Sequence, residues 1–245
     1  MAEIWRKARK LLRIAHHPSA FKGLRYGIAA AIEHEQFLKS LRPKTIIDVG
    51  ANVGQFSLIA SSIHPNSDII AFEPIPQAAD VYERALSGNP RARLVRLAIG
   101  AEARTEILHL SNRADSSSLL AISERQVAMH ADTAEIGQFE VPVQPLHVAL
   151  ADITIATPAL LKIDVQGYEL EVLKGAAKSL DRFQDIYVEL SFMTLYVGQP
   201  LSDEVISFLQ QRGFGLAGVY NLIADRQGAP VQADFHFRNT GAEKL

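Results

Sequence analysis

The chain has 245 residues, of which 48% are hydrophobic, and its formal net charge is -2 at pH 7. This length suits one α/β domain with a helical extension, and the near-neutral charge gives no sign of nucleic-acid binding. Because the chain has no cysteine, disulfides, thiolate catalysis and cysteine-ligated metal sites are excluded.

The first predicted element is an amphipathic helix over residues 2–15. Ile4, Trp5 and Leu11 recur at helical spacing, and the opposite face is basic. Such a helix can lie weakly on an anionic membrane, but we favour a helix that packs on the domain and exposes its basic face. A second helical pattern covers residues 28–41.

Two regions are therefore expected: an N-terminal helical extension over residues 1–42 and the main domain over residues 43–245. No apolar run reaches the roughly 20 residues that span a bilayer. The N-terminus also lacks the uninterrupted apolar core of a secretory signal, so we expect a cytoplasmic protein.

From residue 43 onward, apolar strands and helices alternate, which predicts a parallel sheet with right-handed crossovers. The predicted strands cover residues 46–49, 68–72, 94–99, 159–164 and 186–190. The predicted helices cover residues 55–63, 76–86, 168–173 and 203–211, with Gly175 at the C-terminal end of the third. Residues 214–220 and 231–237 are expected to close the sheet as an antiparallel pair.

The rhythm is interrupted between the third and fourth strands. Residues 105–110 and 140–144 are predicted to be extended, and a polar loop (111–118) and a weakly helical region (121–137) lie between them. We interpret this segment as an insertion at the rim of a pocket.

A glycine-rich turn between a buried strand and a helix is the central motif. Asp48 lies near the end of the first strand, and the turn runs Gly50-Ala51-Asn52-Val53-Gly54. In an open α/β sheet, such a turn lies at the carboxyl end of a strand, where ligands bind. Glycine lets a ligand approach the backbone, and the helix that follows directs free N–H groups at it.

The surroundings of the turn indicate its ligand. Dinucleotide folds use Gly-x-Gly-x-x-Gly, but Asn52 stands where the second glycine would be, and a Walker phosphate loop is absent. Glu73 ends the next strand, where a carboxylate can accept hydrogen bonds from ribose hydroxyls. This set suits S-adenosylmethionine, with its amino-acid end at Asp48 and the turn. The alternative is a purely structural turn in which Asn52 caps the helix.

Three stretches resemble the FkbM family of S-adenosylmethionine-dependent methyltransferases. They are Ile47-Asp48-Val49-Gly50-Ala51-Asn52-Val53-Gly54-Gln55-Phe56-Ser57, Ala71-Phe72-Glu73-Pro74 and Leu161-Lys162-Ile163-Asp164-Val165-Gln166-Gly167-Tyr168-Glu169. The third is the most specific, and it departs from the family only at Gln166, where glutamate is frequent. The resemblance covers residues 45–237 and leaves the first forty uncovered.

The resemblance implies a Rossmann-like class I methyltransferase: an α/β fold with a seven-stranded, mostly parallel sheet and helices on both faces. It also implies O-methylation of a hydroxyl on a sugar, glycan or glycosylated natural product. The expected cofactor contacts are Asp48, Gly50, Asn52, Gly54, Gln55, Phe56, Ser57, Glu73 and Pro74.

Methyl transfer to a hydroxyl requires a group that accepts the hydroxyl proton. Asp164 is the first candidate base, because it ends a central strand beside the turn. Lys162 shares its strand face and needs a buried charge partner, which Asp164 or Glu189 could supply. A structural ion pair is equally compatible with the pattern.

Further polar residues are candidates for the acceptor side. Glu169 begins a helix, where the helix dipole alone favours a carboxylate. Ser117 and Ser118 could bind glycan hydroxyls, although a plain polar loop would have the same composition. Asp164, Glu169 and Glu189 could together hold a divalent cation, but no tight metal-ligand spacing supports this, so we expect no metal and keep the cation as the minority alternative.

Two other functional classes remain open at this point. One is an NAD-dependent oxidoreductase or epimerase, which Asn52 argues against, and the other is a non-catalytic binding protein with a methyltransferase fold. The acceptor, the choice between O- and N-methylation and the oligomeric state cannot be inferred from the residues.

Overall fold

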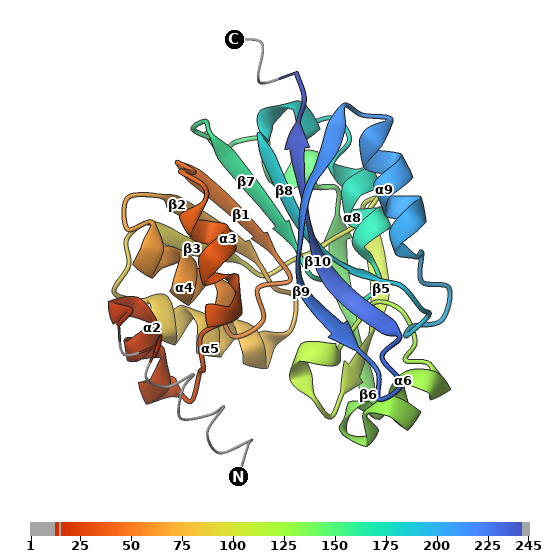
Figure 1. Ribbon diagram of the computed structural model, residues 1–245. Coiled ribbons are helices and arrows are strands. Elements are labelled where there is room, and N and C mark those ends of the chain that lie inside the picture. The colour runs from red at the N-terminus through yellow and green to blue at the C-terminus, as the bar shows by residue number, and fades with distance from the viewer. Residues whose placement is uncertain (1–12, 15, 242–245) are drawn as a thin grey trace.

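A seven-stranded sheet organises the protein in the computed structural model, which describes residues 13, 14 and 16–241 (Figure 1). The strand order is β3-β2-β1-β7-β8-β10-β9. Only β10 runs antiparallel to its neighbours, β8 and β9. The strands are β1 (Thr45–Val49), β2 (Asp68–Phe72), β3 (Ala92–Val95), β7 (Ala159–Ile163), β8 (Asp185–Ser191), β9 (Phe214–Ala224) and β10 (Pro230–Asn239). The predicted fold class is confirmed.

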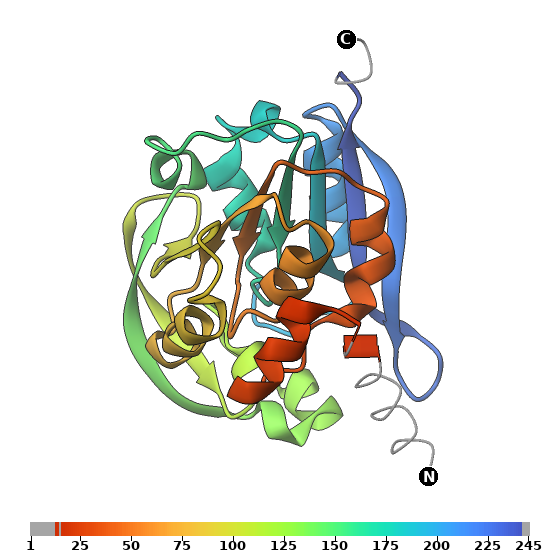
Figure 2. The same cartoon turned by 90° about the vertical axis from the view of Figure 1, so that its left-hand side faces the viewer.

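Helices cover both faces of this sheet, so its central strands are buried on both sides. All five residues of β1 and of β7 are buried, which explains their continuous apolar pattern. One face carries α2 (Pro18–Gly23), α3 (Glu35–Lys39), α4 (Gln55–Ile63) and α5 (Pro76–Leu86), and these helices face the viewer in Figure 2. The other face carries α7 (Leu146–Ala149), α8 (Glu169–Ala176) and α9 (Ser202–Gln210).

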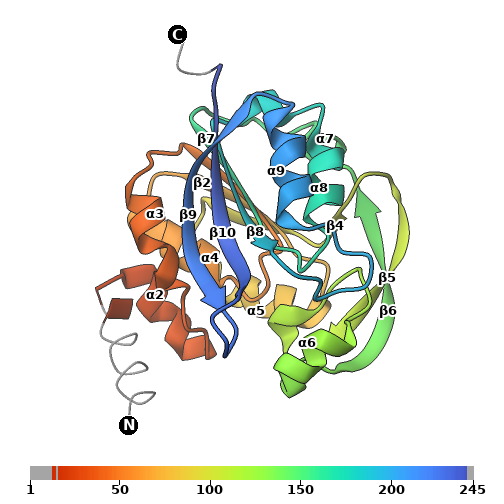
Figure 3. The same cartoon turned by 45° about the vertical axis from the view of Figure 1, so that its right-hand side comes forward.

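The inserted segment forms a second, three-stranded sheet in the order β4-β6-β5. Its strands are β4 (Ala98–Ile99), β5 (Arg104–Ser111) and β6 (Glu135–Gln144), and α6 (Glu124–Met129) lies between the last two. Figure 3 shows this sheet beside α8. The single predicted strand over 94–99 was wrong, because β3 pairs with β2 whereas β4 pairs with β6.

The N-terminal segment is less helical than predicted. Gly27 adopts φ 74°, residues 28–31 are not helical, and the helix predicted over residues 28–41 begins only with a short 3-10 turn at Ile32–His34 before α3. Pro18 begins α2, where proline is tolerated because the first N–H of a helix has no partner. The predicted helix over residues 2–15 lies almost wholly outside the described residues, as does its possible membrane contact.

Gly175 lies at the C-terminal end of α8, as predicted, one residue before Ala176. A Cβ atom there would lie 2.0 Å from the carbonyl oxygen of Gly100. Glycine is therefore required for close packing of α8 on the segment that leads to β5. Within the described part of the chain, no helix is long and apolar enough to cross a bilayer.

Candidate functional site

A cavity of about 660 Å³ opens at the carboxyl ends of the parallel strands. Its wall combines the turn after β1 with the ends of β2, β7, β8 and β10, the 3-10 turn at Ile32–His34 and the loop after β5. The strand order reverses between β1 and β7, and such a reversal opens a crevice in α/β sheets. Its size is typical of small-molecule sites.

The sheet register brings four carboxylates to one level of this wall. Val49 pairs with Phe72 and with Ile163, so Glu73, Gly50 and Asp164 follow side by side. Ile163 pairs with Val188, and Glu189 pairs directly with Asp234. Polar strand ends therefore run across the sheet from β2 to β10.

Glycine is required in the turn after β1. Gly50 adopts φ 78°, and a Cβ atom there would lie 1.8 Å from the carbonyl oxygen of Asp164. Asn52 also adopts a positive φ, 48°, which asparagine tolerates better than most residues. Its side-chain oxygen is buried without a hydrogen-bond partner among the described residues, which leaves an acceptor at the cavity wall.

Glu73 holds this turn against the end of β2. One carboxylate oxygen accepts a hydrogen bond from the Asn52 N–H and the other from the Ile75 N–H, both at 2.8 Å. The side chain is almost fully buried, and burial raises the pKa of Glu73 to about 7 although both hydrogen bonds oppose the shift. Each oxygen retains acceptor capacity for a hydroxyl in the cavity.

Asp48 lies beneath the turn and is fully buried. It accepts a hydrogen bond from the Ser57 hydroxyl at 2.7 Å, and its other oxygen lies 3.0 Å from the Lys162 ammonium. Lys162 also donates to the carbonyl oxygen of Gly50 at 3.1 Å. Burial would lower the pKa of Lys162, but the charges of Asp48 and Asp164 raise it. Lys162 therefore carries a positive charge under the turn.

The predicted partners of Lys162 were partly wrong. Asp48 is its main partner, Asp164 lies at 3.9 Å, and Glu189 makes no contact with it that the structure records. The error arose because Asp48 and Lys162 pair across adjacent strands, β1 and β7, which chain order does not reveal.

The expected cofactor contacts divide into a wall and a support. The residues that line the cavity are Gly50, Asn52, Gln55, Phe56, Glu73 and Pro74. Asp48, Gly54 and Ser57 lie outside this lining. Gly54 packs against Tyr82, whose hydroxyl donates to Ser57 at 3.1 Å. A direct contact between these three residues and a cofactor stays a prediction.

Gln166 joins the two acids on the other side of the turn. Its amide donates to Asp164 at 2.8 Å and to Glu189 at 2.9 Å, and its oxygen accepts a hydrogen bond from the Tyr196 hydroxyl. A second amide, from Gln232, donates to Glu189 at 3.0 Å. Burial raises the pKa of Glu189 well above its ordinary value. Glutamine suits position 166 because an ionised glutamate has no proton to donate to either acid.

The three predicted acceptor-side residues differ in position. Glu169 is buried away from the cavity lining, where it accepts the N–H groups of Val165 and Gly167, and burial raises its pKa to about 7. Ser117 and Ser118 do line the cavity. Ser118 donates to the carbonyl oxygen of Gln166 at 2.7 Å, so the loop after β5 is bonded to the loop after β7.

The lining residues that sequence reasoning missed include His34, Asn221 and Asp234. They come from the N-terminal segment, β9 and β10, and no local motif marks them. The antiparallel pair was predicted, but the register that places Asp234 opposite Glu189 was not. The part of the chain that the structure describes contains no group of three or more histidine or acidic residues placed to hold a metal ion.

Comparisons with known proteins point to one family. The family model described as Methyltransferase FkbM domain matches residues 48–216. The 2-O-methyltransferase NoeI of Sinorhizobium fredii is 27% identical, over 73% of this chain and 76% of that protein. The 31-O-demethyl-FK506 methyltransferase FkbM of Streptomyces tacrolimicus is 28% identical, over 71% and 74%. The hexuronic acid methyltransferase AglP of Haloferax volcanii is 26% identical, over 58% and 54%.

Proposed function

Because the chain belongs to the FkbM methyltransferase family, we propose that it transfers a methyl group to a hydroxyl of a sugar, a glycan or a glycosylated natural product. The family establishes a methyltransferase that uses S-adenosylmethionine. The acceptor class and the roles of individual residues are the proposed part. The ends of neighbouring strands place four residues side by side: Glu73, Gly50, Asp164 and Glu189. This arrangement is the main support for the proposal, because it places a donor-binding half and an acceptor-binding half in one cavity.

The residues on the donor half fit S-adenosylmethionine. Because Gly50 has no side chain, a ligand can contact the backbone of the turn. The side-chain oxygen of Asn52 is an unpartnered hydrogen-bond acceptor at the cavity wall. Glu73 holds the ribose hydroxyls, and the turn with the start of α4 holds the amino-acid end. The ammonium of Lys162, fixed under the turn, favours a carboxylate there. When bound, S-adenosylmethionine supplies the electrophilic methyl group.

The acceptor half lies over β7 and β8. Asp164 is the proposed proton acceptor, since its side chain is 38% exposed, whereas Glu189 is half-buried and accepts hydrogen bonds from two amides. Gln166 holds its carboxylate by one oxygen, which leaves the other oxygen for the acceptor hydroxyl. The Lys162 ammonium lies 3.9 Å from that other oxygen.

The names of the relatives support a hydroxyl acceptor. NoeI is a 2-O-methyltransferase, and FkbM acts on a 31-O-demethyl compound. AglP is named for a hexuronic acid, which is a sugar acid. These names belong to proteins of 26–28% identity, so they support the acceptor class and no particular acceptor.

Labelled methyl transfer tests the proposal. Purified protein is incubated with methyl-labelled S-adenosylmethionine and cell-envelope extracts, and the products are identified by mass spectrometry. We expect label as a methyl ether on a sugar ring. Label on nitrogen, or binding of S-adenosylmethionine without transfer to any fraction, would contradict O-methylation and support N-methylation or a non-catalytic binding protein.

Two finer predictions about location also remain proposals. We place the protein in the cytoplasm, with at most weak membrane contact through residues 2–15. Co-sedimentation with anionic liposomes, with and without those residues, tests the contact. Binding that is unchanged by their removal would exclude that segment as the anchor.

A further inference from the structure

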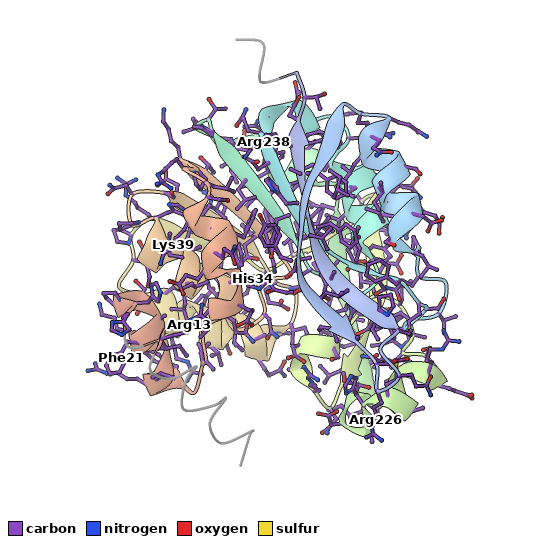
Figure 4. The ribbon with its side chains drawn as sticks, viewed as in Figure 1. Arg13, Phe21, His34, Lys39, Arg226 and Arg238 are labelled. Carbon is purple, nitrogen blue, oxygen red and sulfur yellow. The ribbon has the colours of Figure 1, made fainter. Side chains whose placement is uncertain are left out.

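Several cavity residues lie outside the range that the family model matches, among them His34, Asn221 and Asp234. His34 belongs to the 3-10 turn before α3, and the other two face each other across β9 and β10. Figure 4 shows His34 between the N-terminal helices and β9. The role of these three residues rests on the proposed methyl transfer and concerns the selection of the acceptor.

A bulge in β9 directs Asn221 toward this group. Gln232 pairs with Ile223 and Asp234 with Tyr220, so β9 uses three steps where β10 uses two. The extra residue lies at Asn221 and Leu222, and Asn221 adopts φ 49°. Bulges redirect side chains beside active sites, and a positive φ costs free energy in any residue other than glycine. The distorted backbone lets the Asn221 amide donate to Asp234 at 2.7 Å.

His34 is held by one of its two ring nitrogens. Its Nδ1 lies 3.1 Å from the Tyr187 hydroxyl and 3.5 Å from the Asp234 carboxylate. The Asn221 amide nitrogen lies 3.2 Å from the same Nδ1 atom. All three contacts use Nδ1, and the structure records no partner for Nε2 among the described residues. His34 thus presents one free hydrogen-bonding atom.

The support beneath this group is rigid. The Tyr187 ring is buried and stacks on Phe37 at a centroid distance of 3.8 Å. The His34 ring makes edge contacts with Tyr187 and Phe56, at 5.5 and 5.4 Å. The N–H of Ala31, three residues earlier, donates to the carbonyl oxygen of Gln55 at the start of α4. The segment that carries His34 is therefore fastened to the donor half.

The sheet sets the distance between Asp164 and the group formed by His34, Asn221 and Asp234. Asp234 is on β10, Glu189 is beside it on β8, and Asp164 follows β7, the next strand. Two strand spacings amount to roughly 10 Å. An acceptor that reaches from one group to the other must be larger than a simple alcohol and must carry polar groups at both ends.

We propose that His34 and Asn221, positioned by Asp234 and Tyr187, form a second hydrogen-bonding site that binds another hydroxyl of the acceptor. The enzyme thereby selects polyhydroxylated rings over compounds with one isolated hydroxyl. This recognition is separate from proton removal at Asp164 and from donor binding at the turn.

Ligand-observed NMR titrations test this site on the full chain saturated with S-adenosylhomocysteine, whose affinity is first measured by calorimetry. The probes are the methyl glycosides of glucose, galactose, mannose, fucose and rhamnose, and tetrahydropyranol, a similar ring with one hydroxyl. We expect the best glycoside to bind at least tenfold more tightly than tetrahydropyranol. His34→Leu and Asn221→Ala should each weaken that glycoside at least fivefold, with donor-product affinity within twofold of wild type.

Three variants separate recognition from damage to the fold. His34→Gln keeps a hydrogen-bonding side chain and should restore most of the glycoside affinity. His16→Leu, at an exposed histidine in the same N-terminal segment, should change neither affinity. Asp234→Ala and Asn221→Ala should be strongly non-additive in a double-mutant cycle, because the first acts by positioning the second.

Each outcome decides one statement. If S-adenosylhomocysteine does not bind, the proposed function fails. If it binds but no glycoside does, or glycosides and tetrahydropyranol bind alike, only the second site is refuted. Unchanged glycoside affinity in His34→Leu and Asn221→Ala also refutes it, as does loss of donor-product affinity in the same variants.

Discussion

Glu73 and Asp164 end strands at one level of the sheet but differ in burial. Glu73 is 4% exposed and bonded to two backbone N–H groups, whereas the Asp164 side chain is 38% exposed. A carboxylate fixed by backbone groups shapes a binding surface. A carboxylate with one free oxygen can exchange a proton with a ligand.

Replacing each acid by alanine should therefore affect different measurements. Glu73→Ala removes a ribose acceptor and frees the Asn52 N–H, so donor affinity should fall about 10- to 100-fold. Asp164→Ala should leave donor affinity within about threefold but lower turnover at least 100-fold, the scale of general base catalysis. Calorimetry and a methyl-transfer assay measure the two effects. Unchanged turnover in Asp164→Ala would remove it as the base.

The buried acid Glu169 should make stability depend on pH. Burial raises its pKa from 4.5 to about 7, so the folded state keeps a proton that the unfolded chain has lost between these values. Its contribution is fully present below pH 4.5 and is lost as pH rises through 7. The free energy of unfolding should thus fall by up to about 3 kcal/mol per such group.

Glu169→Gln removes this titration and keeps an oxygen for the N–H groups of Val165 and Gly167. Thermal melts of the ligand-free protein between pH 5 and 8 should show a smaller decline in Tm than wild type. The control is Glu171→Gln on the same helix, half-buried and paired with Lys174. Equal declines in all three proteins would show that Glu169 does not keep its proton near neutral pH.

Among the elements, α8 depends on a single glycine for its distance from the second sheet. The carbonyl oxygen of Gly100 occupies the space that a side chain at Gly175 would need. Because both partners are backbone, neither a rotamer change nor a small side-chain movement relieves the overlap. The helix itself would have to shift.

Gly175→Ala should therefore destabilise the protein by at least about 2 kcal/mol, although alanine is the better helix former. Gly88→Ala is the matched control, since nothing lies within 4 Å of the position of its Cβ atom. Urea unfolding of both variants gives the comparison. A Gly175→Ala protein as stable as the control would mean that α8 can move away freely.

The elements also show where sequence reasoning succeeds. The helices α4 and α5 and strand β2 have the predicted bounds, because their apolar periodicity, glycines and prolines act locally. The helix predicted over residues 28–41 was too long, because the apolar residues of this segment pack on α4 without forming a continuous helix. The role of Gly175 was missed because a close approach between distant backbones leaves no local pattern.

The same contrast divides the candidate site. Its donor half comes mostly from residues 46–74, where adjacent motifs made the turn and Glu73 recognisable. The acceptor half combines Asp164 and Glu189 with three further residues: His34, Asn221 and Asp234. Of these, His34 and Asn221 are 187 residues apart along the chain. The register of β7, β8, β10 and β9 aligns the strand residues, and the packing of the N-terminal segment on α4 adds His34.

At the scale of the whole molecule, ligand binding should stabilise the fold, because the cavity joins β1 and β2 to β7. S-adenosylhomocysteine at 100 times its Kd should add about 2.7 kcal/mol to the free energy of unfolding. NAD should add nothing, since Asn52 leaves no second glycine for a pyrophosphate. Differential scanning fluorimetry compares the increases in Tm that the two ligands cause. A larger shift with NAD would favour the oxidoreductase alternative.

The position of β10 has a consequence for synthesis on the ribosome. Residues 230–239 are the last of the described strands to be made, yet β10 lies inside the sheet, between β8 and β9. A nascent chain that has completed β1, β2 and β7 already holds every residue of the donor turn. It still lacks Asp234, so the proposed acceptor site is complete only after the last of the described strands has been made.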